Sequence, residues 1–261
     1  MKNLNKVALA GASVAAVALM ATSAEAFHRW SDYHWARTST SFNLGVVDSV
    51  SSTWQNEYNI ALSEWSQSTK LNLATTSADD TSKTRKLCRM VAGKMRVCNA
   101  SYGFNGWLGL ASINIDSSHH ITQGTAKMND SYSSYWADPN EKRHVMCQEV
   151  GHVFGLGHTS EDGTTQNTCM DYSQSPTSVS PNSHDYQELD TIYNHVDTYD
   201  TYTAGAGGAV SSAASDAGLP MGVPSGAIRV EANKFHEDWV KSDGKGGYWI
   251  FHVRLAPAGA K

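Results

Sequence analysis

The sequence predicts an α+β fold in which a twisted, mixed sheet carries two long helices. Apolar residues recur at helical spacing over residues 54–68. Short runs at 71–74 and 113–115 alternate between apolar and polar residues, as strands do. Residues 141–154 and 185–196 again have helical composition. Helices and strands are therefore interspersed along the chain.

The first residues are typical of a secretory signal peptide. Lys2 and Lys6 precede an apolar run over residues 7–21, which is short for a bilayer because a spanning helix takes about 20 residues. The run ends in a small-x-small cleavage pattern at 24–26. We expect cleavage after Ala26 and export to the periplasm or the extracellular space. No later apolar run is long enough to cross a membrane, so we expect no membrane association of the mature form.

The charge balance argues against a nucleic-acid partner. Residues 1–26 contain two lysines and one glutamate, so 18 basic and 24 acidic residues remain in the mature chain. A nucleic-acid-binding surface needs clustered lysine and arginine, and no such cluster is present. We expect a protein or peptide partner and a monomeric chain.

Four cysteines in an exported chain suggest two disulfides, for which three pairings are possible. We favour Cys88–Cys98, which closes a short basic segment that resembles a hairpin. We also favour Cys147–Cys169, because the metal motif described below brings these two residues close.

The first part of the mature chain is expected to be extended and then helical. Residues 27–50 mix polar and aromatic residues and look extended, and Thr53 or Ser52 can cap the helix over 54–68. Residues 71–74 alternate like a strand, and the polar segment 75–86 is expected to be a loop.

The next part is expected to supply further strands and a second helix. Residues 106–115 are apolar and glycine-rich, and residues 121–128 have the pattern of a strand. Turn-forming residues over 129–140 precede the helix at 141–154, which is expected to end at Gly155 because glycine terminates helices.

The C-terminal part divides by composition. The main domain is expected to span 27–200 and to end with the helix at 185–196. Residues 201–226 are rich in Ala, Gly and Ser, which is typical of a flexible linker. Residues 227–261 contain two aromatic, strand-like runs around 243–247 and are expected to form a β-hairpin. A lone hairpin is too small to be stable, so it should contact the main domain.

Residues 148–158 read Q-E-x-x-H-x-x-G-x-x-H. Gln148 and His152 are four residues apart on a helix and therefore share a face. Glu149 is rotated by roughly 100° from that direction. Gly155 lets the chain turn sharply, so His158 can return to the same metal ion.

This segment resembles the active site of the metzincin clan of zinc endopeptidases, in particular secreted bacterial matrixin-like proteins. The resemblance covers residues 144–172, with Gln148 in place of the first histidine. Met170, 12 residues after His158, matches the Met-turn of the clan. Tyr172 matches a tyrosine that binds the metal or stabilises the tetrahedral intermediate in some relatives.

The resemblance implies a function. The domain would be a metzincin-like catalytic domain of a secreted zinc endopeptidase, with Gln148, His152 and His158 as metal ligands. Zinc would polarise the peptide carbonyl and activate a water, and Glu149 would act as general base and then as general acid. An edge strand above the site pairs with substrate in relatives, and residues 121–128 are the candidate here.

The departure from the pattern leaves alternatives open. For the third metal contact we rank Gln148 Oε1 first, Tyr172 second and His184 third. His144 is about 12 Å from His152 along the helix axis and is too far. If the substitution prevents metal binding, the chain would be a catalytically silent, metzincin-like pseudoenzyme that binds a protein or glycan.

A structural calcium site is a further possibility. Asp116, Asn129 and Asp130 offer the oxygen ligands that calcium prefers. Solvated loop side chains are the simpler interpretation, because no dense acidic spacing is present.

Overall fold

The computed structural model describes residues 27–203 and 222–260. The expected signal peptide and most of the expected linker lie outside these ranges. The described residues form an α+β fold around a nine-stranded mixed sheet, with the strand order β3-β2-β4-β6-β5-β9-β8-β7 and the short β1 paired to β6.

One half of the sheet is parallel and the other is antiparallel. The parallel pairs join β1, β2, β3, β4 and β6, whereas β5, β7, β8 and β9 pair in antiparallel fashion. The strands are β1 (His34–Trp35), β2 (Phe42–Ser49), β3 (Leu71–Ala78), β4 (Lys94–Ala100), β5 (Trp107–Ile115), β6 (His120–Asn129), β7 (Ile228–Ala232), β8 (His236–Ser242) and β9 (Tyr248–Leu255).

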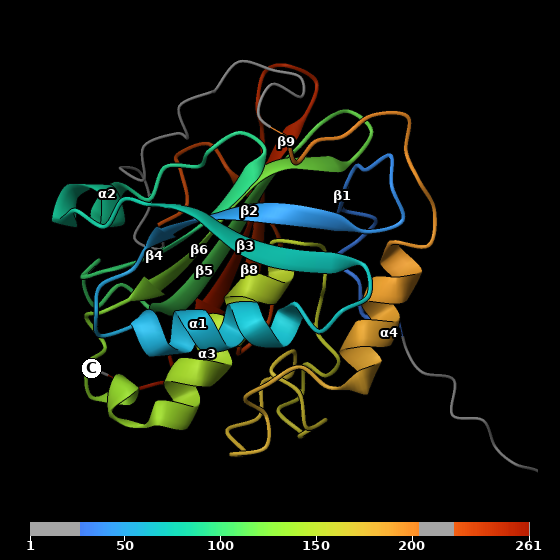
Figure 1. Cartoon of the computed structure of the whole chain (residues 1–261). Coiled ribbons are helices and arrows are strands. Elements are labelled where there is room, and N and C mark those ends of the chain that lie inside the picture. The colour runs from blue at the N-terminus through green and yellow to red at the C-terminus, as the bar shows by residue number, and fades with distance from the viewer. Residues whose placement is uncertain (1–26, 204–221, 261) are drawn as a thin grey trace, which may run out of the picture.

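Helices α1 (Gln55–Trp65) and α3 (Pro139–His152) lie side by side against one face of the sheet (Figure 1). The side chain of Asp138 accepts a hydrogen bond at the start of α3, whose first residue is proline, and both features favour a helix start. Helix α4 (Ser183–Ile192) begins with a capping box. The short α2 (Ser82–Leu87) and a 3₁₀ turn at Tyr135–Ala137 complete the helices of the described chain.

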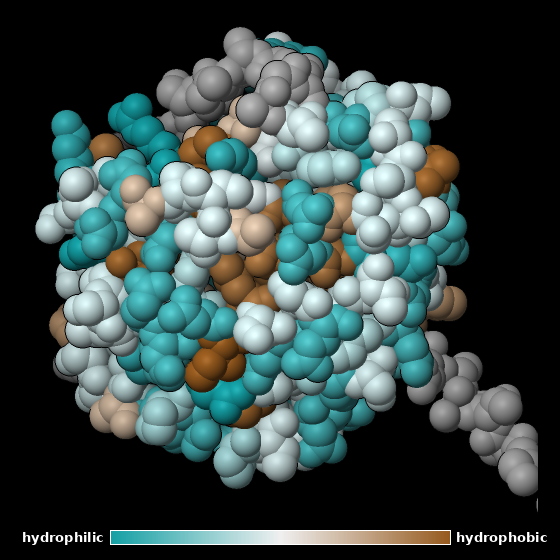
Figure 2. Space-filling view, viewed as in Figure 1, coloured by the Kyte–Doolittle hydropathy of each residue, from teal (hydrophilic) through white to brown (hydrophobic). Residues whose placement is uncertain are grey.

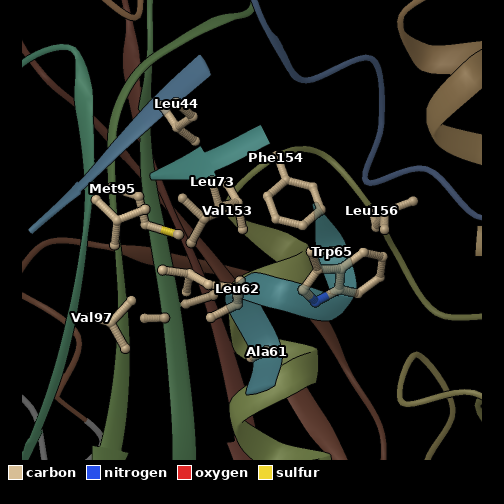
Figure 3. Packing of buried hydrophobic residues seen from close by; sticks show 14 of the residues in the cluster. Leu44, Ala61, Leu62, Trp65, Leu73, Met95, Val97, Val153, Phe154 and Leu156 are labelled. Atoms are coloured by element: carbon tan, nitrogen blue, oxygen red, sulfur yellow. The ribbon is translucent and has the colours of Figure 1, made fainter. Parts of the chain in front are cut away.

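The main core lies between these helices and the sheet. Trp65 of α1 is fully buried, contacts Phe154 edge to face, and donates a hydrogen bond from Nε1 to the carbonyl oxygen of Cys147 at 3.0 Å. Figure 3 shows Leu62 of the same helix close to Met95 and Val97 of β4. This packing attaches α3, and with it the metal motif, to a rigid base.

Three expected elements differ in the structure. The segment expected to be a loop over 75–86 continues β3 to Ala78 and then forms α2. The region around Cys88 and Cys98 is not a hairpin, because β4 pairs in parallel with β2 and β6. The C-terminal part has a third strand, β7, beside its hairpin. Pairing with distant strands explains the extension of β3 and the position of β4.

The strand expected at the sheet edge is in fact interior. Residues 121–128 belong to β6, which pairs with β4 on one side and β5 on the other. Strand β5 is also paired on both sides, because β9 of the C-terminal segment joins it. The expectation that residues 121–128 form an open edge is therefore wrong. The C-terminal hairpin does join the main sheet.

Both expected disulfides are present. Cys88 is bonded to Cys98, and Cys147 is bonded to Cys169. The second joins α3, one residue before Gln148, to the loop that contains Met170. It therefore holds two parts of the candidate site together.

The surface carries no extended apolar region on the face shown in Figure 2, where apolar residues lie in small areas among hydrophilic ones. Among the described residues, no helix combines the length and apolar character needed to cross a bilayer.

Candidate metal centre

The metal motif lies at the C-terminal end of α3, where the chain turns sharply at Gly155. This residue has φ = 99°, and a Cβ atom added to it would lie 2.2 Å from the carbonyl oxygen of Tyr33. Only glycine fits this turn. After the turn, the carbonyl oxygen of Leu156 lies 2.8 Å from Nδ1 of His152. The turn thus brings His158 back and also orients His152.

Three imidazoles meet at this point, and one of them comes from the C-terminal segment. The ligand atoms of His152, His158 and His252 lie within 4.8 Å of one another. Nε2 of His152 is 3.1 Å from Nε2 of His158. The hydroxyl of Tyr172 is 2.8 Å from Nε2 of His158 and 3.2 Å from Nε2 of His252. Three nitrogens and one oxygen therefore converge.

The hydrogen bonds of the opposite ring nitrogens assign the tautomers. Nδ1 of His252 lies 2.7 Å from Oδ1 of Asp238, and Nδ1 of His158 lies 3.3 Å from Oε1 of Glu161. Nδ1 of His152 faces the Leu156 carbonyl described above. We assign the hydrogen to Nδ1 in each ring, because these oxygens act as acceptors. Each Nε2 then presents a lone pair to the centre, which is the arrangement that metal-bound histidines have.

Burial keeps these rings neutral. His152 and His252 are 1% exposed. Burial lowers the pKa of His152, His158 and His252 well below the ordinary histidine value, and mutual repulsion of the rings adds to the effect on His152 and His158. Burial also raises the pKa of the Tyr172 phenol, which therefore keeps its proton. Neutral imidazoles around one point are suitable ligands for zinc.

Gln148 does not face this centre with its oxygen, contrary to the expectation that it is a metal ligand. Oε1 of Gln148 accepts a hydrogen bond from Nη1 of Arg254 at 2.6 Å, and its Nε2 donates to the carbonyl oxygen of Asp171 at 2.9 Å. An oxygen that faces a guanidinium is poorly placed to bind a second cation. His252, rather than Gln148, is the third residue whose ligand atom lies close to those of His152 and His158.

Glu149 is fully buried beside β5. A Cβ atom added to Gly109 would lie 2.4 Å from Oε1 of Glu149, so the absence of a side chain on β5 makes room for this carboxyl group. Apart from a contact with the backbone of Ala111 on β5, the two oxygens of Glu149 have no hydrogen-bond partner among the described residues. Burial raises the pKa of Glu149 well above its usual value, and the positive charge of Arg254 opposes this only in part.

Met170 is buried in the loop that follows the motif. Its backbone N–H donates to Oγ1 of Thr168 at 3.1 Å, and its carbonyl oxygen accepts from the backbone N–H of Thr159 at 2.9 Å. These bonds connect the loop to the residue after His158. The loop therefore holds Tyr172 beside the histidines.

Sequence reasoning missed the contribution of the C-terminal strands. His236 and Asp238 alternate on β8, and His252 and Arg254 alternate on β9. Residues two apart on a strand share a face. Four polar side chains at this spacing in a short hairpin could have indicated a functional face in the sequence. That face joins the histidines only because β9 pairs with β5.

The other expected metal ligands lie elsewhere. The ring of His184, at the start of α4, lies against that of His28, with centroids 4.7 Å apart and planes tilted by 30°. The oxygens proposed for calcium accept protein hydrogen bonds: Asp130 accepts from Trp54 and Asn99, and Asp116 accepts from Ser118, His120 and Tyr199. The Asn129 side-chain oxygen likewise accepts from Tyr102 and Ser131. These contacts argue against the calcium site.

Comparison with known proteins adds little to this description. No protein-family model matches the sequence, and no curated protein matches it. Among solved structures, the chain is similar to high choriolytic enzyme 1, a hatching-enzyme zinc protease from the medaka fish Oryzias latipes. The identity is 11%, the TM-score is 0.34, and the match covers 62% of this chain and 94% of that one.

Proposed function

We propose that this protein is an exported, zinc-dependent endopeptidase of the metzincin type that acts on proteins or peptides as a monomer. The observation that carries the proposal is the convergence of three Nε2 lone pairs and the Tyr172 hydroxyl. His152, His158 and His252 would hold the metal. The hydroxyl of Tyr172 would either bind the metal as a fourth ligand or leave that position to water or substrate. The sequence motif supports His152 and His158 in this set, and the Met-turn follows them in the chain.

Zinc, when bound, would supply Lewis-acid polarisation of the peptide carbonyl and lower the pKa of water. The protein's own groups would move the protons. Glu149 would take a proton from the attacking water and later deliver it to the leaving amine. Its raised pKa suits the second step, because the carboxyl group holds the proton until the amine needs it.

Tyr172 and Arg254 would act on the substrate side of the site. Both residues line a cavity of about 380 Å³. The guanidinium carbon of Arg254 lies 5.5 Å from the centre of the Tyr172 ring. The neutral phenol can donate a hydrogen bond to an oxygen that gains negative charge, which is the most effective form of electrostatic stabilisation in acyl transfer.

One observation favours the second candidate function, a silent pseudoenzyme that binds a protein or glycan. Strand β9 pairs with β5 along its length, from Trp107 to Ile115. A substrate strand could not occupy that side of β5 while β9 is present. Glu149 is also fully buried. Activity in the full chain therefore requires access through the cavity beside Tyr172 or a shift of β9.

Metal content and proteolysis, measured together, test the proposal. The mature chain from Phe27 would be compared with Glu149→Gln and with the control Glu237→Gln. Glu237 lies on β8 between His236 and Asp238, so its side chain points to the opposite face of the strand. Each protein would be analysed for bound zinc and incubated with a reduced, unfolded protein.

We expect zinc in all three proteins, cleavage by wild type and Glu237→Gln, and a loss of roughly 10²- to 10⁴-fold in rate for Glu149→Gln, the range for general acid–base catalysis. Zinc binding without cleavage by any of them would favour the pseudoenzyme. Absence of zinc from the folded wild-type protein would contradict the ligand set itself.

A further inference from the structure

A second group of imidazoles lies apart from the candidate metal centre, where β1 and the start of β6 meet the segment after α4. It consists of His34, His120, His195 and Asp197. Nε2 of His34 is 3.1 Å from Nε2 of His195. Oδ1 of Asp197 is 3.7 Å from Nε2 of His34, 3.5 Å from Nε2 of His120 and 3.5 Å from Nε2 of His195. One carboxylate oxygen is thus close to three imidazole nitrogens.

The rings are arranged around a common point. The centroid of the His34 ring is 4.8 Å from that of His120 and 4.8 Å from that of His195, and both pairs are nearly perpendicular. The side chains of His34, His120 and Asp197 are 13%, 12% and 10% exposed, whereas His195 is the outermost, at 44%. The cluster is therefore partly buried, and His195 is its most exposed member.

The outer atoms of the cluster are held by other residues. Nδ1 of His34 lies 2.8 Å from the backbone carbonyl oxygen of Asp32, so this nitrogen is the donor. The Tyr199 hydroxyl donates to Oδ2 of Asp116 and therefore accepts from Nδ1 of His120, at 2.5 Å.

The carboxylate is oriented in the same way. Oδ2 of Asp197 accepts from the backbone N–H of Arg37 at 2.9 Å, which leaves Oδ1 to face the rings. Outer partners that orient the inner atoms are a regular feature of protein metal sites.

With these tautomers, Nε2 of His34 can accept a hydrogen bond within the cluster only from Nε2 of His195, which lies 3.1 Å away. Nε2 of His34 and Nε2 of His120 both carry lone pairs, and Oδ1 of Asp197 is also an acceptor. Acceptors that point at one another need a cation between them. A hydrogen on Nε2 of His195 would satisfy one such contact, whereas a metal ion would satisfy His34, His195 and Asp197 together, because their ligand atoms lie within 4.8 Å of one another.

We infer that His34, His195 and Asp197 bind a second, structural zinc ion, with His120 beside them as the candidate fourth donor. The ligand atoms of His34, His195 and Asp197 lie within 4.8 Å of one another, and a further imidazole would complete the tetrahedral set that structural zinc sites have. The site would join the N-terminal segment, the sheet and the chain after α4. Trp35, the residue after His34, donates a hydrogen bond from Nε1 to the carbonyl oxygen of Val153 at 3.0 Å. A zinc ion bound to His34 would therefore also stabilise the end of α3.

The number of zinc ions bound per chain tests this inference separately from the proposed function. The full mature chain would be compared with His195→Ala, with Asp197→Asn, and with His152→Ala, which damages only the first centre. His119→Ala is the matched control, because His119 is adjacent to His120 and pairs with Asp32 outside the cluster.

We expect about two zinc ions for wild type and His119→Ala, about one for each of the three other single variants, and none for the double variant His152→Ala/His195→Ala. Added zinc should raise the Tm of His152→Ala, because binding to the folded state stabilises it, and should leave the Tm of the double variant unchanged. Circular dichroism would establish that each variant is folded. A folded His152→Ala protein that binds no zinc, or a His195→Ala protein that keeps two, would overturn the inference.

Discussion

Replacement of His252 and of Gln148, each by alanine, separates two accounts of the third metal ligand. The motif assigns that position to Gln148, whereas the structure brings His252 to within 3.2 Å of the Tyr172 hydroxyl and turns the oxygen of Gln148 to Arg254. We predict that His252→Ala weakens zinc binding strongly and that Gln148→Ala weakens it little.

The expected magnitudes follow from the donor set. Apparent zinc binding by a protein site of four ligands is about 10–16 kcal/mol, or about 3 kcal/mol per ligand. Loss of one imidazole should therefore raise the Kd about 10²-fold. Gln148→Ala instead leaves the buried guanidinium of Arg254, which is 4% exposed, without this acceptor. That loss should lower the free energy of unfolding by about 1–3 kcal/mol.

The assay is competition for zinc with a chromophoric chelator, at pH 7.5. The proteins would carry His195→Ala in addition, so that only the first centre is titrated. Urea unfolding of the same proteins would report stability. The reasoning is refuted if Gln148→Ala weakens zinc binding about 10²-fold while His252→Ala leaves the Kd unchanged.

Three further predictions concern stability. Burial raises the pKa of Asp185 to about 6 from 3.8, so the folded protein retains a proton that the unfolded chain has lost, and this contribution disappears as the pH rises through 6. The difference in unfolding free energy between wild type and Asp185→Asn should fall by about 3 kcal/mol between pH 4 and 7, measured by urea unfolding; a rise would contradict the neutral carboxyl group. Replacement of both Cys147 and Cys169 by alanine, which opens a loop of 22 residues, should cost about 3 kcal/mol in thermal unfolding, and an unchanged Tm would speak against it. Trp65→Ala should cost about 3–5 kcal/mol because Trp65 is fully buried and donates to the Cys147 carbonyl oxygen; a cost below about 1 kcal/mol in urea would show that the core closes over the cavity.

The elements that could be predicted from the sequence are those that depend on neighbouring residues. Helical periodicity located α1, and composition located α3, because residues three and four apart decide which face of a helix is buried. The turn at Gly155 was also predictable, since positive φ favours glycine.

The elements that were missed depend on distant pairing. Strand β4 and the continuation of β3 to Ala78 are held by parallel partners, which local alternation does not reveal. The interior position of β6 likewise follows from β4 and β5 on its two sides.

The sequence by itself determined the local chemistry of the candidate centre. A helix that ends near a glycine brings His152 and His158 together whatever the rest of the chain does, and the loop after them carries Met170 and Tyr172.

Tertiary structure decided which side chain joins them. The register of β9 on β5 sets Ala111 opposite His252 and Gly109 opposite Arg254. This register brings an imidazole to the histidines and a guanidinium to Gln148. Strand register is selected by which face of the strand is buried against distant elements, so no local pattern in the sequence could reveal it.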